Sequence, residues 1–149
     1  MEIRNSAKAI IIKDNHILVI QKEDEEGAWY LLPGGGQDHG ETLIEAVKRE
    51  CLEEIGANIE VGEIKLIREY IGKNHEFATS DSSVHQIEFY FECRLISDVD
   101  EDLATQPDDG QTGIKWIPLD KNESYRVYPK FLLNALKGKV ELVYYGDKN

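Results

Sequence analysis

Three glutamates in a segment with helical periodicity have the clearest chemical potential in this sequence. Glu50, Glu53 and Glu54 are spaced i, i+3 and i+4, so in a helix their carboxylates share one face. Like charges at this spacing repel each other, and we therefore expect a positive charge among them. Carboxylate oxygens suit hard cations such as Mg²⁺ or Mn²⁺ and suit structural zinc poorly. The three glutamates predict a divalent metal site, although on their own they are more typical of a solvated helix face.

The glutamates belong to a longer pattern of fixed spacing, which favours the metal site over the solvated face. The pattern reads Gly35-x5-Glu41-x7-Arg49-Glu50-Cys51-x-Glu53-Glu54-x-Gly56-Ala57. So many specified positions do not come together by chance in a chain of this composition. At the start of this pattern, Pro33 and three consecutive glycines exclude a helix or a central strand.

The elements that must position this segment are strands and helices in mixed order. Residues 41–55 are predicted as a helix that ends at Gly56. Its apolar stripe contains Ile44, Val47, Cys51 and Ile55, and the carboxylate face lies beside this stripe, toward solvent. Strands are predicted at 7–12, 16–20, 59–70, 84–96 and 114–119, a second helix at 130–136, and polar loops at 72–83, expected to be mobile, and 97–113. This order indicates a mixed α/β fold.

Length and composition set the class of protein. With 149 residues, 41% hydrophobic and 31% charged, the chain is expected to form one folded domain over residues 1–149. No apolar run approaches the roughly 18 residues of a membrane span. The first residues lack the features of an export signal, so a cytoplasmic location is expected. Cys51 and Cys93 show no metal-binding spacing and are expected to be reduced and buried.

The net charge of −12 limits the partners of the chain. A strongly acidic protein repels polyanions, which disfavours a broad nucleic-acid groove. A small anionic ligand would therefore need a bridging cation.

Residues 35–57 resemble the signature of the Nudix hydrolases, Gly-x5-Glu-x7-Arg-Glu-U-x-Glu-Glu-x-Gly-U, in which U is a bulky aliphatic residue. Every Gly, Glu and Arg of the signature is present, while Cys51 and Ala57 are smaller than the residues expected at the U positions. Residues 29–35 and 116–119 also resemble the segments that flank the signature. The resemblance implies the Nudix αβα sandwich, with a mixed β-sheet between helices.

The resemblance also implies an activity and its cofactor. The activity is hydrolysis of the pyrophosphate bond in a nucleoside triphosphate or other nucleoside-diphosphate derivative, by water attack at phosphorus. Glu53, Glu54 and the carbonyl of Gly35 would hold Mg²⁺ or Mn²⁺, and Glu50 would be a further ligand or a base. Arg49, with Glu41, would support catalysis by bracing the loop and the helix through salt bridges.

Further residues are candidates for contacts with the substrate. Gly34 and Gly36 would let the backbone approach the metal and phosphates. Trp29 and Tyr30 could stack on a nucleobase, and Tyr90 could line the same pocket, with an ordinary sheet surface as the alternative for Tyr90.

An acidic residue from a late loop is a common additional ligand or base in this family. Asp108 and Asp109 are the candidates here, with a solvated acidic loop as an equal alternative. Glu88 and Glu92 are weaker candidates, because one face of an edge strand is often simply charged.

The signature does not identify the substrate. A small domain with little beyond the signature favours a nucleoside triphosphate or a compact nucleotide derivative. The alternatives are an ADP-ribose, nucleotide-sugar or dinucleoside-polyphosphate hydrolase, an enzyme acting on the 5′ end of RNA, and a nucleotide-sensing module without catalysis. The expected partner is a small nucleotide, with no membrane and no broad nucleic-acid contact, and the resemblance leaves a homodimer open.

Overall fold

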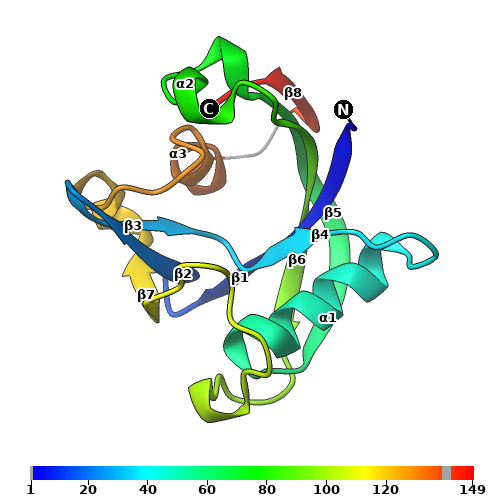
Figure 1. Ribbon diagram of the computed structural model, residues 1–149. Coiled ribbons are helices and arrows are strands. Elements are labelled where there is room, and N and C mark those ends of the chain that lie inside the picture. Colours follow the sequence, from blue (N-terminus) through cyan, green and yellow to red (C-terminus); the bar gives the residue numbers. More distant parts are fainter. Residues whose placement is uncertain (1, 139–141) are drawn as a thin grey trace.

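A mixed β-sheet forms the framework of the structure, a computed structural model that describes residues 2–138 and 142–149 (Figure 1). The strands are β1 (Arg4–Lys13), β2 (His16–Asp24), β3 (Gly27–Leu31), β4 (Gly34–Gly36), β5 (Ile59–Ile71), β6 (His85–Leu95), β7 (Gly113–Pro118) and β8 (Tyr144–Asp147). Their order is β3-β2-β1-β6-β5-β8, with β4 added to β1 and β7 added to β2. The β1–β6 and β5–β8 pairs are parallel and the other pairs are antiparallel.

Local signals account for the first strands. Asp14 and Asn15 adopt positive φ angles of 52° and 59°, as a two-residue hairpin turn between twisted strands requires. This turn pairs Lys13 with His16 and confirms the predicted hairpin. The three glycines form the short strand β4, which pairs with β1 alone, so they do not make a central strand.

Helix α1 (Leu43–Ile55) carries the signature glutamates and has a defined signal at each end. Thr42 and Glu45 form a reciprocal capping box at the start, and Gly56 ends the helix with a φ of 62°. The predicted apolar stripe is wrong at Ile44, which is 45% exposed. Around the helix axis, Ile44 lies on the same side as the buried residues of α1. It lies in the first turn, however, and the buried residues of the helix begin only at Ala46.

Helices cover both faces of the sheet, which confirms the α/β sandwich (Figure 1). One apolar core joins α1 to β1 through residues that include Ala7, Ala9, Val47 and Cys51. A second core joins Leu132 and Leu133 of α3 (Leu132–Lys137) to the other side of the sheet. Cys51 and Cys93 are free and buried, as expected.

Several elements differ from the sequence-based prediction. The loop expected at 72–83 contains the short helices η1 (Gly72–Asn74) and α2 (Ala78–Asp81), and the hydroxyl of Tyr70 donates a 2.7 Å hydrogen bond to Asp81. The strand β8 was not predicted, because it depends on pairing with the distant β5. The remaining short helices are η2 (Glu101–Leu103) and η3 (Leu119–Ser124).

Within the described ranges, no helix is long and apolar enough to cross a membrane.

Candidate active site

Strand β4 lies directly against the carboxylates of α1. The backbone N–H of Gly34 donates a 2.8 Å hydrogen bond to Oε1 of Glu54. At Gly35, an added Cβ atom would come within 2.7 Å of the Glu50 carboxyl group, so only glycine leaves room for this carboxylate. Gly34 has a φ of 137°, which side-chain-bearing residues rarely adopt. The glycines therefore allow the backbone and the two carboxylates to approach each other.

The positive charge expected among the glutamates is the guanidinium of Arg49. Its Nη1 atom donates to Glu50 at 3.0 Å and to Glu53 at 3.1 Å. The rest of the guanidinium faces Glu41, with a 2.7 Å bond from Nη2, and the carbonyl of Gly36 at 2.9 Å. These hydrogen bonds, above all those with Glu41, raise the pKa of Arg49 and lower the pKa of Glu41. Arg49 thus joins the helix to the glycine segment.

Glu54 is buried, which corrects the expectation that all three carboxylates face solvent. Its side chain lies in the buried arc of α1 and the residue is only 2% exposed. Burial raises the pKa of Glu54 to about 8, although the charge of Lys8 and the hydrogen bond from Gly34 oppose this shift. Burial also raises the pKa of Glu50. Both carboxylates would be stabilised in their charged form by additional positive charge.

The fit of a divalent cation can be judged from these donors. In residues 2–138 and 142–149, no three Asp, Glu, His or Cys side chains are arranged as ligands of one ion. Instead, Arg49 forms ion pairs with Glu50 and Glu53. The donor chemistry nevertheless fits Mg²⁺ or Mn²⁺, which prefer oxygen ligands. The Glu50 carboxylate lies next to the backbone of Gly35, and a side chain at position 35 would occupy the space between them.

The late loop approaches the end of α1 through Asp108 and not through Asp109. Lys22 pairs with Asp108 at 2.8 Å, and the negative charge of Asp108 contributes to the raised pKa of Glu54. Gln111 connects the loop to the helix by donating a 3.0 Å hydrogen bond to the carbonyl of Glu54. Asp109 is exposed. The structure therefore separates the two candidates that the sequence left equal.

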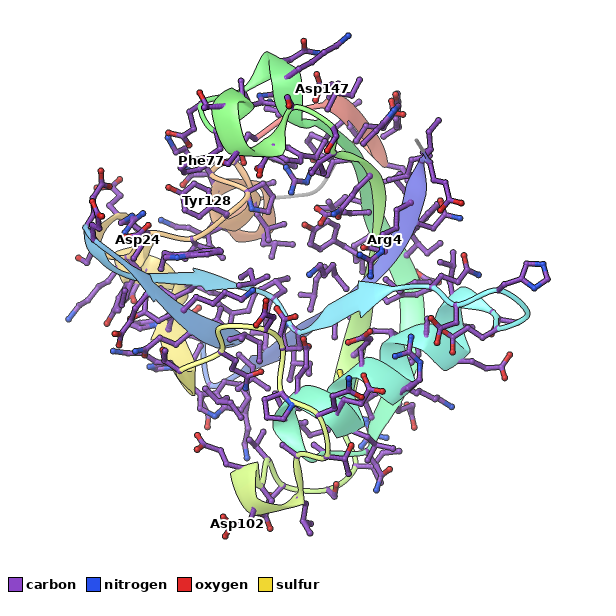
Figure 2. All side chains as sticks on the ribbon, in the orientation of Figure 1. Arg4, Asp24, Phe77, Asp102, Tyr128 and Asp147 are labelled. Carbon is purple, nitrogen blue, oxygen red and sulfur yellow. The ribbon has the colours of Figure 1, made fainter. Side chains whose placement is uncertain are left out.

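A cavity of about 480 Å³ opens beside this region. Its aromatic wall includes Trp29, Tyr128 and Phe77, and the ring of Tyr128 makes edge-to-face contacts of 5.6 Å with each of the other two. Figure 2 shows Phe77 and Tyr128 next to each other, between α2 and β3. Trp29 and Tyr90 both line this cavity, whereas Tyr30 is buried in the core and does not.

The floor of the cavity contains a buried ion pair, which overturns the edge-strand interpretation of Glu88. Strand β6 lies between β1 and β5, and Glu88 is 6% exposed. It accepts hydrogen bonds from Nε of Arg68 at 2.5 Å and from the hydroxyl of Tyr90 at 2.8 Å. Burial alone would raise the pKa of Glu88, but Arg68 and Lys8 bring it below its usual value. Glu92 is exposed.

Sequence reasoning missed several residues that line the cavity, which are Lys8, Arg68, Phe77 and Tyr128. Only Lys8 carried a usable signal, since a lysine inside an otherwise apolar strand is unusual. The others reach the cavity from separate elements, so their proximity depends on the complete fold.

Comparisons with known proteins agree with this geometry. A family model of the NUDIX domain matches residues 3–134. An RNA pyrophosphohydrolase of Helicobacter pylori (strain P12) is 42% identical over 72 residues, which are 45% of this chain and 43% of that protein. The match thus spans less than half the length of that relative.

Solved structures show the same fold. A NUDIX hydrolase from Nitrosomonas europaea superposes with a TM-score of 0.73 at 19% identity, covering 91% of this chain and 87% of that chain. An ADP-ribose pyrophosphatase from Streptococcus suis superposes with a TM-score of 0.65 at 20% identity, covering 98% and 100%. Since the domain model covers nearly the whole chain and the fold agrees, this chain belongs to the NUDIX domain family.

Proposed function

We propose that the chain is a metal-dependent pyrophosphohydrolase that acts on a nucleoside triphosphate or a compact nucleoside-diphosphate derivative. One observation carries this proposal. The Gly34 and Gly35 backbone lies against the Glu54 and Glu50 carboxylates, and an aromatic cavity opens at Leu32 and Lys8, next to the same glycines. A phosphate-binding region and a base-binding region are therefore neighbours.

The cavity is suited to the nucleobase end of the substrate. Its wall offers the faces and edges of Trp29, Phe77 and Tyr128, on which a base can stack. The side chain of Gln86 lies at the same floor and can hydrogen-bond to a base edge. We assign base recognition to this wall and floor.

Glu53, Glu54 and the Gly35 carbonyl would hold Mg²⁺ or Mn²⁺, with Glu50 as a further ligand or as the base. A divalent cation supplies charge neutralisation for phosphate oxygens and makes water a better nucleophile near neutral pH. Glu50 is suited to accept the proton of the attacking water, because burial raises its pKa. Arg49 keeps the Glu50 and Glu53 carboxylates at their positions when they carry no other cation.

Asp108 is the second candidate for the base. It lies in the loop that Gln111 joins to Glu54, and it forms an ion pair with Lys22 of β2. We assign this role to Asp108 and not to Asp109, because Asp109 is exposed.

A second candidate substrate is the triphosphorylated 5′ end of RNA, because the relative from Helicobacter pylori is named an RNA pyrophosphohydrolase. The net charge of −12 argues against a long RNA contact, whereas a terminal nucleotide bound in the cavity exposes far fewer phosphates to this charge. A cytoplasmic location and a homodimer remain predictions from the sequence.

The decisive experiment is a product-resolved hydrolysis panel. It contains nucleoside triphosphates, ADP-ribose, nucleotide sugars, dinucleoside polyphosphates and triphosphorylated RNA, each with Mg²⁺, with Mn²⁺ and with chelator. We expect cleavage that chelator abolishes, with a nucleoside monophosphate among the products. Faster cleavage of RNA than of free nucleotides would favour the second candidate. Binding of a nucleotide without cleavage of any compound would overturn the enzymatic proposal in favour of a sensing module.

A further inference from the structure

The polar floor of the cavity is one face of the sheet. On β1, Arg4, Ser6 and Lys8 occupy every second position, so their side chains point to the same side of the strand. Their register partners on β6 are Gln86, Glu88 and Tyr90, so the two strands present these six side chains together. The cavity is lined by four of them, namely Lys8, Gln86, Glu88 and Tyr90.

Lys8 is distinguished from the other cations of this cavity by its partners. Arg68 pairs with Glu88 at 2.5 Å, and Arg126 pairs with Asp24 at 2.8 Å. Among the described residues, the Lys8 ammonium has neither a hydrogen bond nor an ion pair, although Lys8 is only 7% exposed. The residue is therefore more than nine-tenths buried, and the charged groups around it lie beyond ion-pair distance of its ammonium.

The position of the ammonium follows from a second observation. In the described part of the chain, every fully buried side-chain nitrogen or oxygen has a hydrogen-bond partner. Since the Lys8 ammonium has no such partner, it is not fully buried and must reach the open space of the cavity that Lys8 lines. A lysine that is buried along its stem and open only at its ammonium presents that charge to whatever occupies the cavity.

The location of Lys8 indicates which part of a ligand it would meet. Lys8 is the register partner of Gly34, whose N–H bonds to Glu54. The positive charge of Lys8 acts on Glu54 in α1 and on Glu88 in the cavity floor, so Lys8 lies within electrostatic range of both the α1 carboxylates and the cavity. In a nucleotide, the groups between the base and the reacting bond are the sugar and the phosphates.

We propose that Lys8 binds a phosphate oxygen of the substrate and so positions the phosphate chain between the cavity and α1. This inference rests on the proposed function, because it assigns a role within the same site. An ammonium that opens into a cavity without a carboxylate partner is free to pair with an oxyanion there, because no ion pair has to be broken first. The positive charge of Lys8 also explains how a chain with a net charge of −12 can accept an anionic ligand at this position.

The test measures binding of inorganic pyrophosphate by calorimetry in the presence of chelator, so that neither metal nor turnover contributes. The variants are Lys8→Met, which removes the charge at similar length, and Lys8→Arg, which keeps it. Lys13→Met is the matched control, because Lys13 lies on the same strand and is exposed. We expect Lys8→Met to weaken the affinity about tenfold or more. Lys8→Arg should retain most of the affinity, and Lys13→Met should leave it unchanged.

Several outcomes would overturn the proposal. They are wild-type affinity in Lys8→Met, equal loss in Lys8→Met and Lys8→Arg, or no binding of pyrophosphate by the wild-type protein. If Lys8→Met does not fold, a pyrophosphate titration of the wild-type protein followed by amide NMR decides. The shifts should then centre on Lys8 and Gly34 and spare Lys13, and the reverse pattern would contradict the proposal.

The same proteins separate this inference from the proposed function. If the wild-type enzyme cleaves nucleotides while Lys8→Met has an unchanged KM and binds pyrophosphate normally, only the role of Lys8 fails. If the wild-type protein cleaves nothing but binds pyrophosphate through Lys8, only the proposed reaction fails.

Discussion

The backbone N–H of Gly34 donates a 2.8 Å hydrogen bond to Oε1 of Glu54, which lies 20 residues later in the chain. This bond joins the glycine strand β4 to the last turn of α1 inside the protein. It uses one oxygen of a carboxylate that burial brings to a pKa of about 8. The contact explains why a glutamate of the signature can occupy the buried side of the helix.

Glu54→Gln is expected to abolish hydrolysis while preserving the fold. The amide oxygen of glutamine can still accept the hydrogen bond from Gly34, but an amide is a much weaker ligand for a hard cation than a carboxylate. We expect kcat to fall roughly 100-fold or more. Circular dichroism and thermal unfolding check the fold, and Glu63→Gln, an exposed change on β5, is the control. An active Glu54→Gln enzyme would refute the role of Glu54.

The stability of the metal-free protein should depend on pH through the same residue. The pKa of Glu54 is raised by burial from its ordinary value of 4.5 to about 8, so the folded state holds the proton more tightly than the unfolded state does. The stabilisation is complete below about pH 4.5 and is lost as the pH rises through about 8. Between these values, Glu54 should lower the free energy of unfolding by up to about 1.4 kcal/mol per pH unit.

Urea denaturation between pH 5 and pH 9, with chelator, measures this contribution. The difference between wild type and Glu54→Gln should change across the window, because the glutamine variant lacks the titrating group. Parallel curves would show that Glu54 does not titrate there. Added Mg²⁺ should stabilise the wild-type protein more at high pH than at low pH, since the cation competes with a proton.

Arg49→Lys should weaken the fold more than a charge-conserving change normally does. The guanidinium contacts Glu41, Glu50, Glu53 and the Gly36 carbonyl at once, and an ammonium cannot reproduce this fork. We expect a loss of about 1–3 kcal/mol in the free energy of unfolding, measured by urea denaturation. Arg94→Lys tests an exposed ion pair with Glu60 and should change stability by about 0.5 kcal/mol or less. Equal effects of the two changes would contradict the bracing role.

Asp108→Asn and Asp109→Asn should differ in activity. Asp108 pairs with Lys22 and acts electrostatically on Glu54, whereas Asp109 is exposed. If Asp108 is the base, its replacement lowers kcat about 100-fold or more and removes the acidic limb of the pH profile. Asp109→Asn should leave both unchanged. An unchanged kcat and pH profile in Asp108→Asn would assign the proton transfer to Glu50.

The parts of the structure that the sequence predicted are those with local causes. The hairpin at Asp14 and Asn15 and the helix between Thr42 and Gly56 are each specified by a turn or cap within a few residues. A positive charge among the glutamates could be inferred as well, because neighbouring carboxylates repel each other. The sequence assigned this charge to a divalent cation, whereas in the structure the guanidinium of Arg49 supplies it. These features depend on contacts along one element.

What the sequence could not predict depends on contacts between distant elements. Strand β8 exists through its pairing with β5, and Glu88 becomes buried only when β6 lies between β1 and β5. Periodicity places Ile44 in the apolar stripe of α1 and Glu54 on the face beside it, but only the packed structure shows that Ile44 is exposed and Glu54 is buried. Lys8 stands out in the sequence as a lysine inside an apolar strand, but the cavity that it lines forms only in the complete fold.

The ion pairs of Arg49 have a consequence for the order in which the protein is made and activated. In a zinc finger, the fold forms only when the metal is supplied, so the metal-free chain is degraded or aggregates. Here a residue of the chain already balances Glu50 and Glu53, and α1 can assemble with β4 before any cation arrives. In the metal-dependent reaction proposed above, newly synthesised molecules would thus be folded before the cation arrives and would become active when it is supplied.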